Sequence, residues 1–364
     1  MLYYIGLMAG TSVDAVDAAL VSISNSQIAL VDSLEVNFAP ALREELKALM
    51  YPGEDEIVRA NTCSILIAQL FADATLQLLA KSKVQAHQIR AIGSHGQTLR
   101  HHPPSAETHT AFTYQIGDPS TIATLTNITT VADFRSKDIA LGGQGAPLVP
   151  AFHAYAFGEA NKKRAIVNIG GVANTTLLDG KTVLHGFDCG PGNGLMDKWI
   201  KKQKDRNYDK NGAWAQSGVV NRSLLNSMLA EPYFAAKAPK STGPELFNLA
   251  WLDAFKCNDD PANIQATLCE LTALSICNAS VGVSDIYLCG GGTQNEFLTS
   301  RIIELVGSET NVSITDELGI PANNVEACAF AWLAHQTLEG LAGNLPSSTG
   351  AKRAAILGGI YSAE

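Results

Sequence analysis

The sequence lacks the cysteine pattern of a disulfide framework or of a zinc site. Its seven cysteines are an odd number and no two form a C-x-x-C pair, so we expect reduced thiols buried as small apolar side chains. No apolar run approaches the roughly 20 residues that a membrane span needs, and the first residues lack the basic and apolar regions of a signal peptide. We therefore expect a cytoplasmic protein without a membrane partner.

An excess of positive charge is missing as well. The 26 Lys and Arg residues stand against 35 Asp and Glu residues, which gives a formal net charge of −9. This balance argues against nucleic acid or an anionic membrane surface as a partner. A negatively charged small substrate would need basic groups placed at its own site. The 364 residues suffice for two domains of ordinary size.

Strand and helix patterns alternate along the chain. Alternating apolar and polar residues predict three strands within 1–40, and apolar residues at helical spacing predict helices within 41–82. A predicted helix at 119–126 follows Asp118, a suitable cap, and short strands flank it. The stretch 164–190 predicts strand, glycine turn, strand, turn and strand, which repeats the organisation of the N-terminus.

The Gly- and Pro-rich stretch 137–150 is the predicted boundary between two halves. The remaining elements are predicted as helices at 147–158, 192–204, 221–230, 245–256, 262–281 and 322–342, and as strands at 285–292 and 353–361. This order predicts an α/β protein with mixed sheets flanked by helices. Two halves with similar beginnings also predict a cleft between them.

Two common phosphate-binding motifs are absent. The stretch DGKT at 179–182 ends like a P-loop, but Thr175 occupies the place of the first glycine, so we expect a hairpin turn. In GPGNG, Leu195 replaces the third glycine of the dinucleotide-binding pattern. Four other glycine clusters follow strand-like runs, at 8–12, 168–174, 187–193 and 289–295. Each alone is consistent with a tight turn, but four at strand ends favour a ligand site, since open α/β sheets bind ligands beyond the carboxyl ends of their strands.

Three charged side chains are candidates for chemistry. Asp188, in FDCGPGN, lies on a turn stiffened by glycine and proline, where it is either a general base or a cap for the following helix. Arg135, in VADFRSKD, either clamps a phosphate or carboxylate or forms a structural salt bridge. Glu326, in NNVEACAFAWLA, complements the dipole of the last long helix in its simplest interpretation.

Histidine is concentrated in SHGQTLRHHPP. The spacing of His95, His101, His102 and His109 matches no metal-ligand pattern. We expect His95 to have a hydrogen-bonding role, and His101 and His102 to be exposed loop residues.

Taken in order, these stretches resemble the anhydro-N-acetylmuramic acid kinase family of the actin-like ATPase superfamily, which includes sugar kinases and heat-shock chaperones. The resemblance spans nearly the whole chain and rests on IGLMAGTSVDAVDAALV, GSHGQTLRHHP, TYQIGDPSTIA, VADFRSKDIALGGQGAPLVP, NIGGVANTTLL, FDCGPGNGLMDKW, STGPELFN, CGGGTQN and NNVEACAFAWLA. It implies a two-domain actin-like (ribonuclease H-like) fold with an interdomain cleft. Domain I would comprise 1–135 with 345–364, and domain II 136–344.

The activity that the resemblance implies couples two events. Water opens the 1,6-anhydro bridge of anhydro-N-acetylmuramic acid at C1, and O6 receives the γ-phosphoryl group of ATP, which gives N-acetylmuramic acid 6-phosphate and ADP. Such a kinase serves peptidoglycan recycling and amino-sugar catabolism, with ATP and Mg²⁺ as cofactors, and it is expected to be a homodimer. The alternatives are another sugar or acid kinase of the superfamily, or a catalytically silent nucleotide-binding sensor.

The resemblance also assigns residues. Asp188 becomes the base that activates water, Glu326 contacts the substrate together with His95 and Arg135, and Asp14 is the carboxylate on the magnesium side. Asp17 is the lesser acidic candidate. The predicted contacts to ATP phosphates and adenosine are Gly10, Thr11, Ser12, Val13, Asp14, Ala15, Val16, Asp17, Asn168, Gly170, Gly171, Gly290, Gly291 and Gly292.

Two positions depart from the family pattern. Ala15 stands where the family usually has glycine, which would disfavour a positive φ. Pro244 stands where many relatives carry a basic residue.

Overall fold

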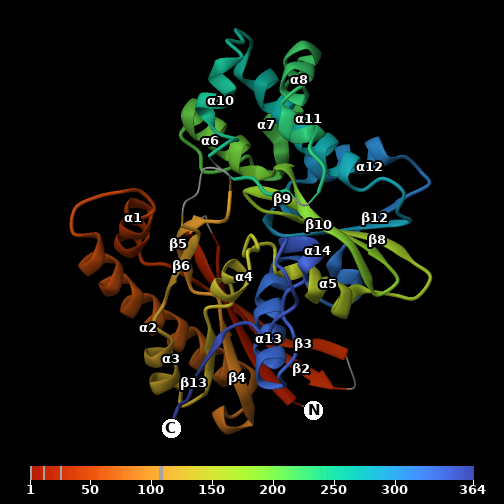
Figure 1. Ribbon diagram of the computed structural model, residues 1–364. Coiled ribbons are helices and arrows are strands. Elements are labelled where there is room, and N and C mark those ends of the chain that lie inside the picture. The colour runs from red at the N-terminus through yellow and green to blue at the C-terminus, as the bar shows by residue number, and fades with distance from the viewer. Residues whose placement is uncertain (1, 11–12, 25–26, 106–109, 239, 244) are drawn as a thin grey trace. The chain divides into compact units, whose positions relative to one another are not determined.

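Three antiparallel strands open the chain, as the alternation of apolar residues predicts. The computed structural model describes residues 2–10, 13–24, 27–105, 110–238, 240–243 and 245–364. Contacts divide the chain into unit 1, Met1–Ala156 with Asn324–Glu364, and unit 2, Phe157–Asn323. Each unit is built on its own mixed sheet (Figure 1).

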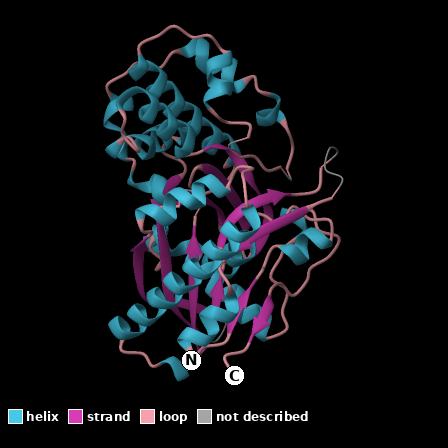
Figure 2. Ribbon diagram, turned by 90° about the vertical axis from the view of Figure 1, so that its left-hand side faces the viewer, coloured by secondary structure: helices cyan, strands magenta, loops and turns pink. Residues whose placement is uncertain are grey.

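The sheet of unit 1 has the order β13-β7-β4-β1-β2-β3. Its strands are β1 (Leu2–Ala9), β2 (Ala15–Ser24), β3 (Gln27–Asn37), β4 (Ile89–Ser94), β7 (Thr130–Ala132) and β13 (Gly359–Tyr361). Its helices include α1 (Pro40–Leu49), α2 (Glu56–Ser82), α3 (Pro119–Thr126), α4 (Ser136–Ala140), α5 (Val149–Phe157), α13 (Val325–Leu338) and α14 (Pro346–Thr349), and η1 (Ala86–Gln88) is a short 3₁₀ turn. In Figure 2, the unit that holds both chain ends has its strands between helices.

Opposite faces of this sheet carry different helices, because successive side chains of a strand alternate between faces. Ile5 and Leu7 of β1 pack in one core with the buried side of α2, including Ile67 and Phe71. Gly6, between them in sequence, faces α13: a Cβ there would lie 1.8 Å from the carbonyl oxygen of Ala327. Glycine at this position therefore lets the backbone of α13 approach β1 closely.

Helix α2 is long and apolar enough to cross a membrane by length and composition alone, the one such helix in the described residues. The expectation that no run approaches that length is therefore wrong. Half of the most apolar window of the helix is buried inside the protein, and its buried side chains belong to the core of unit 1. The high apolar content of the helix accordingly serves packing on the sheet.

The sheet of unit 2 has the order β10-β9-β8-β11-β12. Its strands are β8 (Lys163–Ile169), β9 (Val172–Asp179), β10 (Thr182–Pro191), β11 (Asp285–Cys289) and β12 (Asn311–Ile314). Its longer helices are α6 (Asn193–Lys204), α8 (Arg222–Leu229), α10 (Leu249–Ala254), α11 (Pro261–Ala279) and α12 (Glu296–Val306), with α7 (Ala213–Gln216) and α9 (Pro232–Ala235) as single turns. The 3₁₀ turns are η2 (Lys210–Gly212), η3 (Gly291–Gln294), η4 (Thr315–Leu318) and η5 (Ala322–Asn324).

The two units share one strand topology. In each, the first three sheet strands form an antiparallel meander, the fourth pairs in parallel with the first, and the fifth pairs in parallel with the fourth. This identity confirms the repeated organisation that the sequence suggests, and with it the α/β class with mixed sheets flanked by helices. The turn at Gly180 joins β9 and β10 with a φ of +60°, so DGKT is a hairpin turn as predicted.

The boundaries of the units differ from the predicted domain boundaries of 135 and 345. Helix α5 belongs to unit 1, where Phe152 and Tyr155 contact the ring of Trp332 at 6.1 and 5.7 Å between centroids. Trp332 lies on α13, which packs on β1, β4 and β2. The last long helix therefore joins the N-terminal unit, although its sequence follows that of unit 2.

Other elements differ in detail. His101 and His102 are exposed, as expected, but they lie on a strand, β5 (Gln97–His102), which pairs with β6 (Phe112–Ile116). Strand β12 and helix α12 are absent from the sequence prediction. The helix predicted at 245–256 is confined to α10, and that predicted at 322–342 begins, as α13, after the 3₁₀ turn η5.

Candidate active site

Asp188 lies near the end of β10, opposite Asn174 of β9. It does not cap the following helix, because Gly192 is the N-cap residue of α6 and makes no side-chain capping bond. Instead Asp188 Oδ2 accepts a hydrogen bond of 2.9 Å from the backbone N–H of Thr242. Burial raises the pKa of Asp188 to about 7, against the smaller opposing effect of that hydrogen bond. A carboxylate with such a pKa is suited to accepting a proton near neutral pH.

The main chain of Asp188 is held by the segment that leads to Thr242. Tyr233 donates from its hydroxyl to the Asp188 carbonyl at 2.6 Å, and the Asp188 N–H donates to the Lys240 carbonyl at 3.2 Å. Lys240 Nζ in turn donates to the Tyr233 carbonyl at 2.9 Å. Pattern analysis missed Tyr233 and Lys240, because no periodicity marks this irregular segment. Pro244 lies outside the described residues.

The glycine turn between β8 and β9 is bound to the start of α6. The N–H groups of Gly192 and Gly194 donate to the Gly171 carbonyl at 3.0 and 3.1 Å, and that of Asn193 donates to the Gly170 carbonyl at 2.8 Å. The first N–H groups of α6 are thereby occupied, so the helix start supports the turn. A Cβ at Gly171 would meet nothing within 4 Å, which leaves its backbone open to a ligand.

The fourth glycine cluster, at 289–295, follows β11 directly. Gly290 has a φ of +82°, and a Cβ there would lie 2.2 Å from Asn168 Oδ1, at the end of β8. A Cβ at Gly292 would lie 2.2 Å from the Ile169 side chain, whereas one at Gly291 would meet nothing within 4 Å. The predicted nucleotide residues of unit 2 thus come together at the carboxyl ends of two neighbouring parallel strands.

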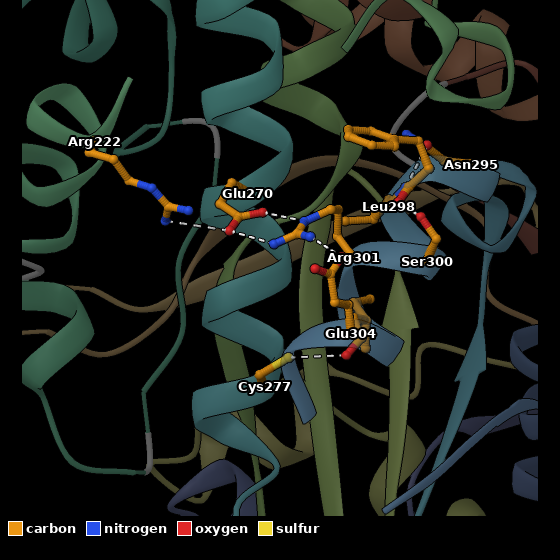
Figure 3. Close-up of polar contacts among 10 residues, drawn as sticks. Arg222, Glu270, Cys277, Asn295, Leu298, Ser300, Arg301 and Glu304 are labelled. Atoms are coloured by element: carbon orange, nitrogen blue, oxygen red, sulfur yellow. Dashed lines mark hydrogen bonds and ion pairs between the residues drawn. The ribbon is translucent and has the colours of Figure 1, made fainter. Parts of the chain in front are cut away.

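Helix α12 carries this glycine turn and is fixed by a buried ion pair (Figure 3). Glu270 of α11 has only 1% of its side chain exposed, and it accepts hydrogen bonds from Arg301 Nε at 2.8 Å and Nη2 at 3.0 Å. Arg222 approaches the same carboxylate at 3.8 Å, and Glu304 pairs with Arg301 on its exposed side. Asn295 caps α12 by accepting from the Leu298 N–H at 3.0 Å.

In unit 1 the structure brings together His95 and Arg135. His95 Nε2 accepts from Arg135 Nη2 at 2.9 Å and from Nε at 3.2 Å, and Nδ1 lies 2.9 Å from the Gly96 carbonyl. These partners assign the ring proton to Nδ1. Burial and the charge of Arg135 hold the pKa of His95 well below its usual value, so His95 is a neutral acceptor, as its predicted hydrogen-bonding role requires.

Glu326 lies in the first turn of α13 and within the electrostatic reach of Arg135. Burial raises the pKa of Glu326, and the charge of Arg135 opposes that rise. Asp17 of β2 has a pKa raised to about 7, chiefly by burial and then by the charges of Glu35 and Glu326. Asp17, predicted with the nucleotide residues, therefore lies within the electrostatic reach of the predicted substrate residue Glu326.

The first glycine turn has its unusual backbone at Val13. The Val13 N–H donates to the Gly10 carbonyl at 3.2 Å, and its φ of 54° is rare for a β-branched residue. Ala15 begins β2 in an extended conformation, so a glycine is not needed there. The side chains of Val13 and Val16 pack in the core of unit 1. Thr11 and Ser12 lie outside the described residues.

Asp14 is the exposed acid of this turn. Its side chain is 53% exposed and forms an ion pair with Arg43. Among the described residues, no group of three His, Cys, Asp or Glu side chains is placed to hold a metal ion. A metal at this turn would accordingly take most of its ligands from elsewhere, as Mg²⁺ bound to phosphates and water does.

Comparison with known proteins gives one consistent result. Residues 2–363 match the family model described as anhydro-N-acetylmuramic acid kinase. Curated proteins of that name are 50% identical in Shewanella pealeana, over 100% of this chain and 99% of that protein, and 48% identical in Saccharophagus degradans, over 98% of each. One from Pseudomonas putida is 46% identical over 100% of both chains. Among solved structures, component A of (R)-2-hydroxyglutaryl-CoA dehydratase from Acidaminococcus fermentans matches 91% of this chain and 96% of its own with a TM-score of 0.48 and 12% identity, a likeness too weak to bear on function.

Proposed function

Because this chain belongs to the anhydro-N-acetylmuramic acid kinase family, we propose that Asp188 is the general base of a kinase that opens and phosphorylates 1,6-anhydro-N-acetylmuramic acid. The family match covers nearly the whole chain, so the enzyme is a phosphotransferase of cell-wall recycling that uses ATP. Neither a silent nucleotide sensor nor another sugar kinase is favoured. The observation that carries the proposal is the buried Asp188, whose pKa of about 7 allows it to accept a proton at neutral pH.

Asp188 acts on the water that opens the sugar. It takes a proton from the water molecule as the water oxygen bonds to C1, and the bond between C1 and O6 breaks. The electron pair released on O6 forms the new bond to the γ-phosphorus of ATP, and ADP leaves. The Thr242 N–H and the backbone bonds from Tyr233 and to Lys240 keep the carboxylate in one orientation throughout.

His95, Arg135 and Glu326 serve the sugar in this proposal. Arg135 presents a cationic fork, and Glu326 presents a buried carboxyl group that accepts or donates according to its protonation. His95 accepts from Arg135 and stays neutral, so it orients the guanidinium without repelling it. Polar groups buried in fixed positions discriminate strongly among sugars, because a sugar lacking the matching group leaves them unpaired.

Backbone groups of the glycine turns serve ATP. Gly171 and Gly291 have open faces, and the turns at Gly10 and Gly171 each join the first two strands of a unit. The exposed carboxylate of Asp14 fits a Mg²⁺ ion that keeps most of its water ligands. Binding would require the ion pair between Asp14 and Arg43 to break. When bound, that ion neutralises phosphate charge. We also propose a cytoplasmic location and a homodimer.

Incubation of the protein with ATP, Mg²⁺ and 1,6-anhydro-N-acetylmuramic acid tests the function. We expect equal amounts of ADP and a sugar 6-phosphate, both of which mass spectrometry detects. Water labelled with ¹⁸O should place the label at C1, because the phosphoryl acceptor is the original O6. ADP formation without a phosphorylated sugar, or no ADP at all, would contradict the proposal.

Gly171→Ala tests the nucleotide assignment. The added methyl group meets no protein atom within 4 Å, so the fold should be retained. It would occupy space next to the phosphates and raise KM for ATP about tenfold, which corresponds to about 1.4 kcal/mol. Gly359→Ala at the sheet edge is the control, since its Cβ meets only ordinary contacts, at 3.4 Å and beyond. Equal KM values for ATP in both variants and the parent protein would refute the assignment.

A further inference from the structure

We propose that Asp138, which no pattern or comparison assigns to the site, is a positioning residue that fixes Arg135 for binding the sugar. The inference rests on the proposed role of Arg135 and concerns how the protein holds that side chain. Asp138 lies on α4, and its side chain is fully buried. Burying a carboxylate without hydrogen-bond partners would destabilise the protein. The partners of Asp138 therefore identify the segments that this carboxylate holds together.

Asp138 accepts hydrogen bonds on both carboxylate oxygens. Oδ1 accepts from Asn344 Nδ2 at 2.6 Å and from Thr349 Oγ1 at 2.8 Å, and Oδ2 accepts from the Gly145 N–H at 2.8 Å. Asn344 and Thr349 belong to the C-terminal segment, more than 200 residues away in sequence. The carboxylate thus ties the loop after α4 to that segment, and the Gln144 N–H adds a bond of 2.7 Å to the Thr349 carbonyl.

Gly145 connects Asp138 to Arg135 through hydrogen bonds. The Gly145 carbonyl accepts from Arg135 Nη1 at 2.8 Å, so one residue binds Asp138 through its N–H and Arg135 through its oxygen. Its φ of +69° is the left-handed conformation, and a Cβ would lie 2.9 Å from Ile139 Cγ1. At Gly143 a Cβ would lie 2.2 Å from Asp138 Oδ2. The loop therefore follows the carboxylate so closely that any shift of Asp138 moves Gly145.

The guanidinium of Arg135 is held on two sides. Its partners among the described residues are His95, through Nε and Nη2, and Gly145, through Nη1. Of its five N–H bonds, three are used, which leaves two for a ligand. A planar fork with two free donors binds a sugar acceptor well only when its plane is fixed. His95 and Gly145 fix that plane, and Asp138 fixes Gly145.

The charge of Asp138 contributes a second effect. Burial of Arg135 lowers its pKa, and the charges of Glu326 and Asp138 oppose that decrease. Glu326 is a proposed substrate contact, whereas Asp138 accepts three hydrogen bonds from groups of the protein. The carboxylate of Asp138 therefore attracts the guanidinium electrostatically as well as fixing Gly145.

Steady-state kinetics and melting temperatures of four variants test the inference. Asp138→Asn removes the charge and places an amide N–H against one of its present donors. It should raise KM for the anhydro sugar at least roughly tenfold and leave KM for ATP unchanged. Thr349→Val, the matched control, removes one donor to the same carboxylate but keeps the charge and the Gly145 bond, so KM for the sugar should change less than about twofold. Arg135→Gln should raise KM for the sugar further, and adding Asp138→Asn to it should have no additional effect.

The outcomes separate the two proposals. Unchanged sugar KM in Arg135→Gln refutes the substrate role of Arg135. A large effect in Arg135→Gln with none in Asp138→Asn, or additive effects in the double variant, refutes the positioning role of Asp138. Parallel losses of sugar affinity and melting temperature in Asp138→Asn and Thr349→Val also refute it. If Asp138→Asn does not fold, Gly145→Ala keeps the carboxylate and displaces the carbonyl, and it must raise KM for the sugar selectively for the inference to stand.

Discussion

Asp188→Asn should lower kcat by about 10²- to 10⁴-fold, the usual contribution of a general base. The amide oxygen can still accept the hydrogen bond from the Thr242 N–H, and the side chain has the same size, so the local structure should persist. What the amide cannot do is take a proton from water. The measurement is kcat at saturating ATP and sugar, and normal turnover in the variant would eliminate Asp188 as the base.

The pH dependence provides the control for this variant. The pKa of Asp188 is about 7 in the folded protein, against an ordinary value of 3.8, so the folded state binds the proton more tightly than the unfolded state. Ionisation of Asp188 therefore reduces stability as pH rises from about 4 to about 7, and the full cost is present above pH 7. Asparagine avoids that cost, so at pH 8 the variant should melt at the same temperature as the parent protein or higher. In the parent protein kcat should fall tenfold per pH unit below about pH 7, and a flat profile there would contradict the assignment.

Glu270→Gln should reduce the free energy of unfolding of unit 2 by about 3 kcal/mol, at the lower end of the range for removing one partner of a buried ion pair. The glutamine keeps the shape of the side chain but leaves the Arg301 guanidinium without its bidentate carboxylate. Because Trp199, Trp214 and Trp251 lie in unit 2, tryptophan fluorescence during urea unfolding follows mainly that unit. KM for ATP should rise as well, since α12 carries the glycine turn after β11.

Glu304→Gln is the matched control for Glu270→Gln. Glu304 pairs with the same arginine, but its side chain is 70% exposed, and exposed ion pairs contribute about 0 to 1 kcal/mol. A double replacement, Glu270→Leu with Arg301→Met, should recover most of the lost stability, because no buried unpaired charge remains and Arg222 and Glu304 are exposed. Equal losses for Glu270→Gln and Glu304→Gln would show that burial of the ion pair is not what stabilises α12.

The sequence predicted the elements whose periodicity is strong. The opening meander, α2 and the meander of unit 2 follow from alternation and helical spacing, because one face of each is buried. Strand β5 escaped prediction because only its first half has buried side chains, at Gln97 and Leu99, whereas His101 and His102 at its end are exposed. The packing of α13 on the sheet of unit 1 was not predicted for another reason. The apolar sequence of a helix indicates that the helix is buried, but it does not indicate which sheet covers it. Only the glycines at 6 and 93, where a Cβ would meet the α13 backbone, hold that information.

The candidate site divides in the same way. The glycine turns stand out in the sequence because they follow strands. Asp188 stands out because it lies in a stretch rich in glycine, although the structure places it within β10 and not after it. Local reasoning reached both. Arg135 was left open between a ligand clamp and a salt bridge, and the structure gives it a neutral histidine and a carbonyl as hydrogen-bond partners. The raised pKa values of Asp188 and Asp17 depend on burial by distant segments, which no local pattern records. Asp138 is not marked by any local pattern, because its partners Asn344 and Thr349 come from the distant C-terminal segment.

Helix α13 follows unit 2 in sequence but packs in unit 1. This arrangement affects the order in which the two units can fold on the ribosome. Unit 2 is one continuous stretch, so it can fold as soon as residue 323 has emerged. Unit 1 begins first but ends last, since the face of its sheet that carries Gly6 and Gly93 stays uncovered until α13 is synthesised. We therefore expect the usual N-terminal-first order of co-translational folding to be reversed here. Nascent chains that end before residue 324 should contain a protease-resistant unit 2 and a protease-sensitive N-terminal unit.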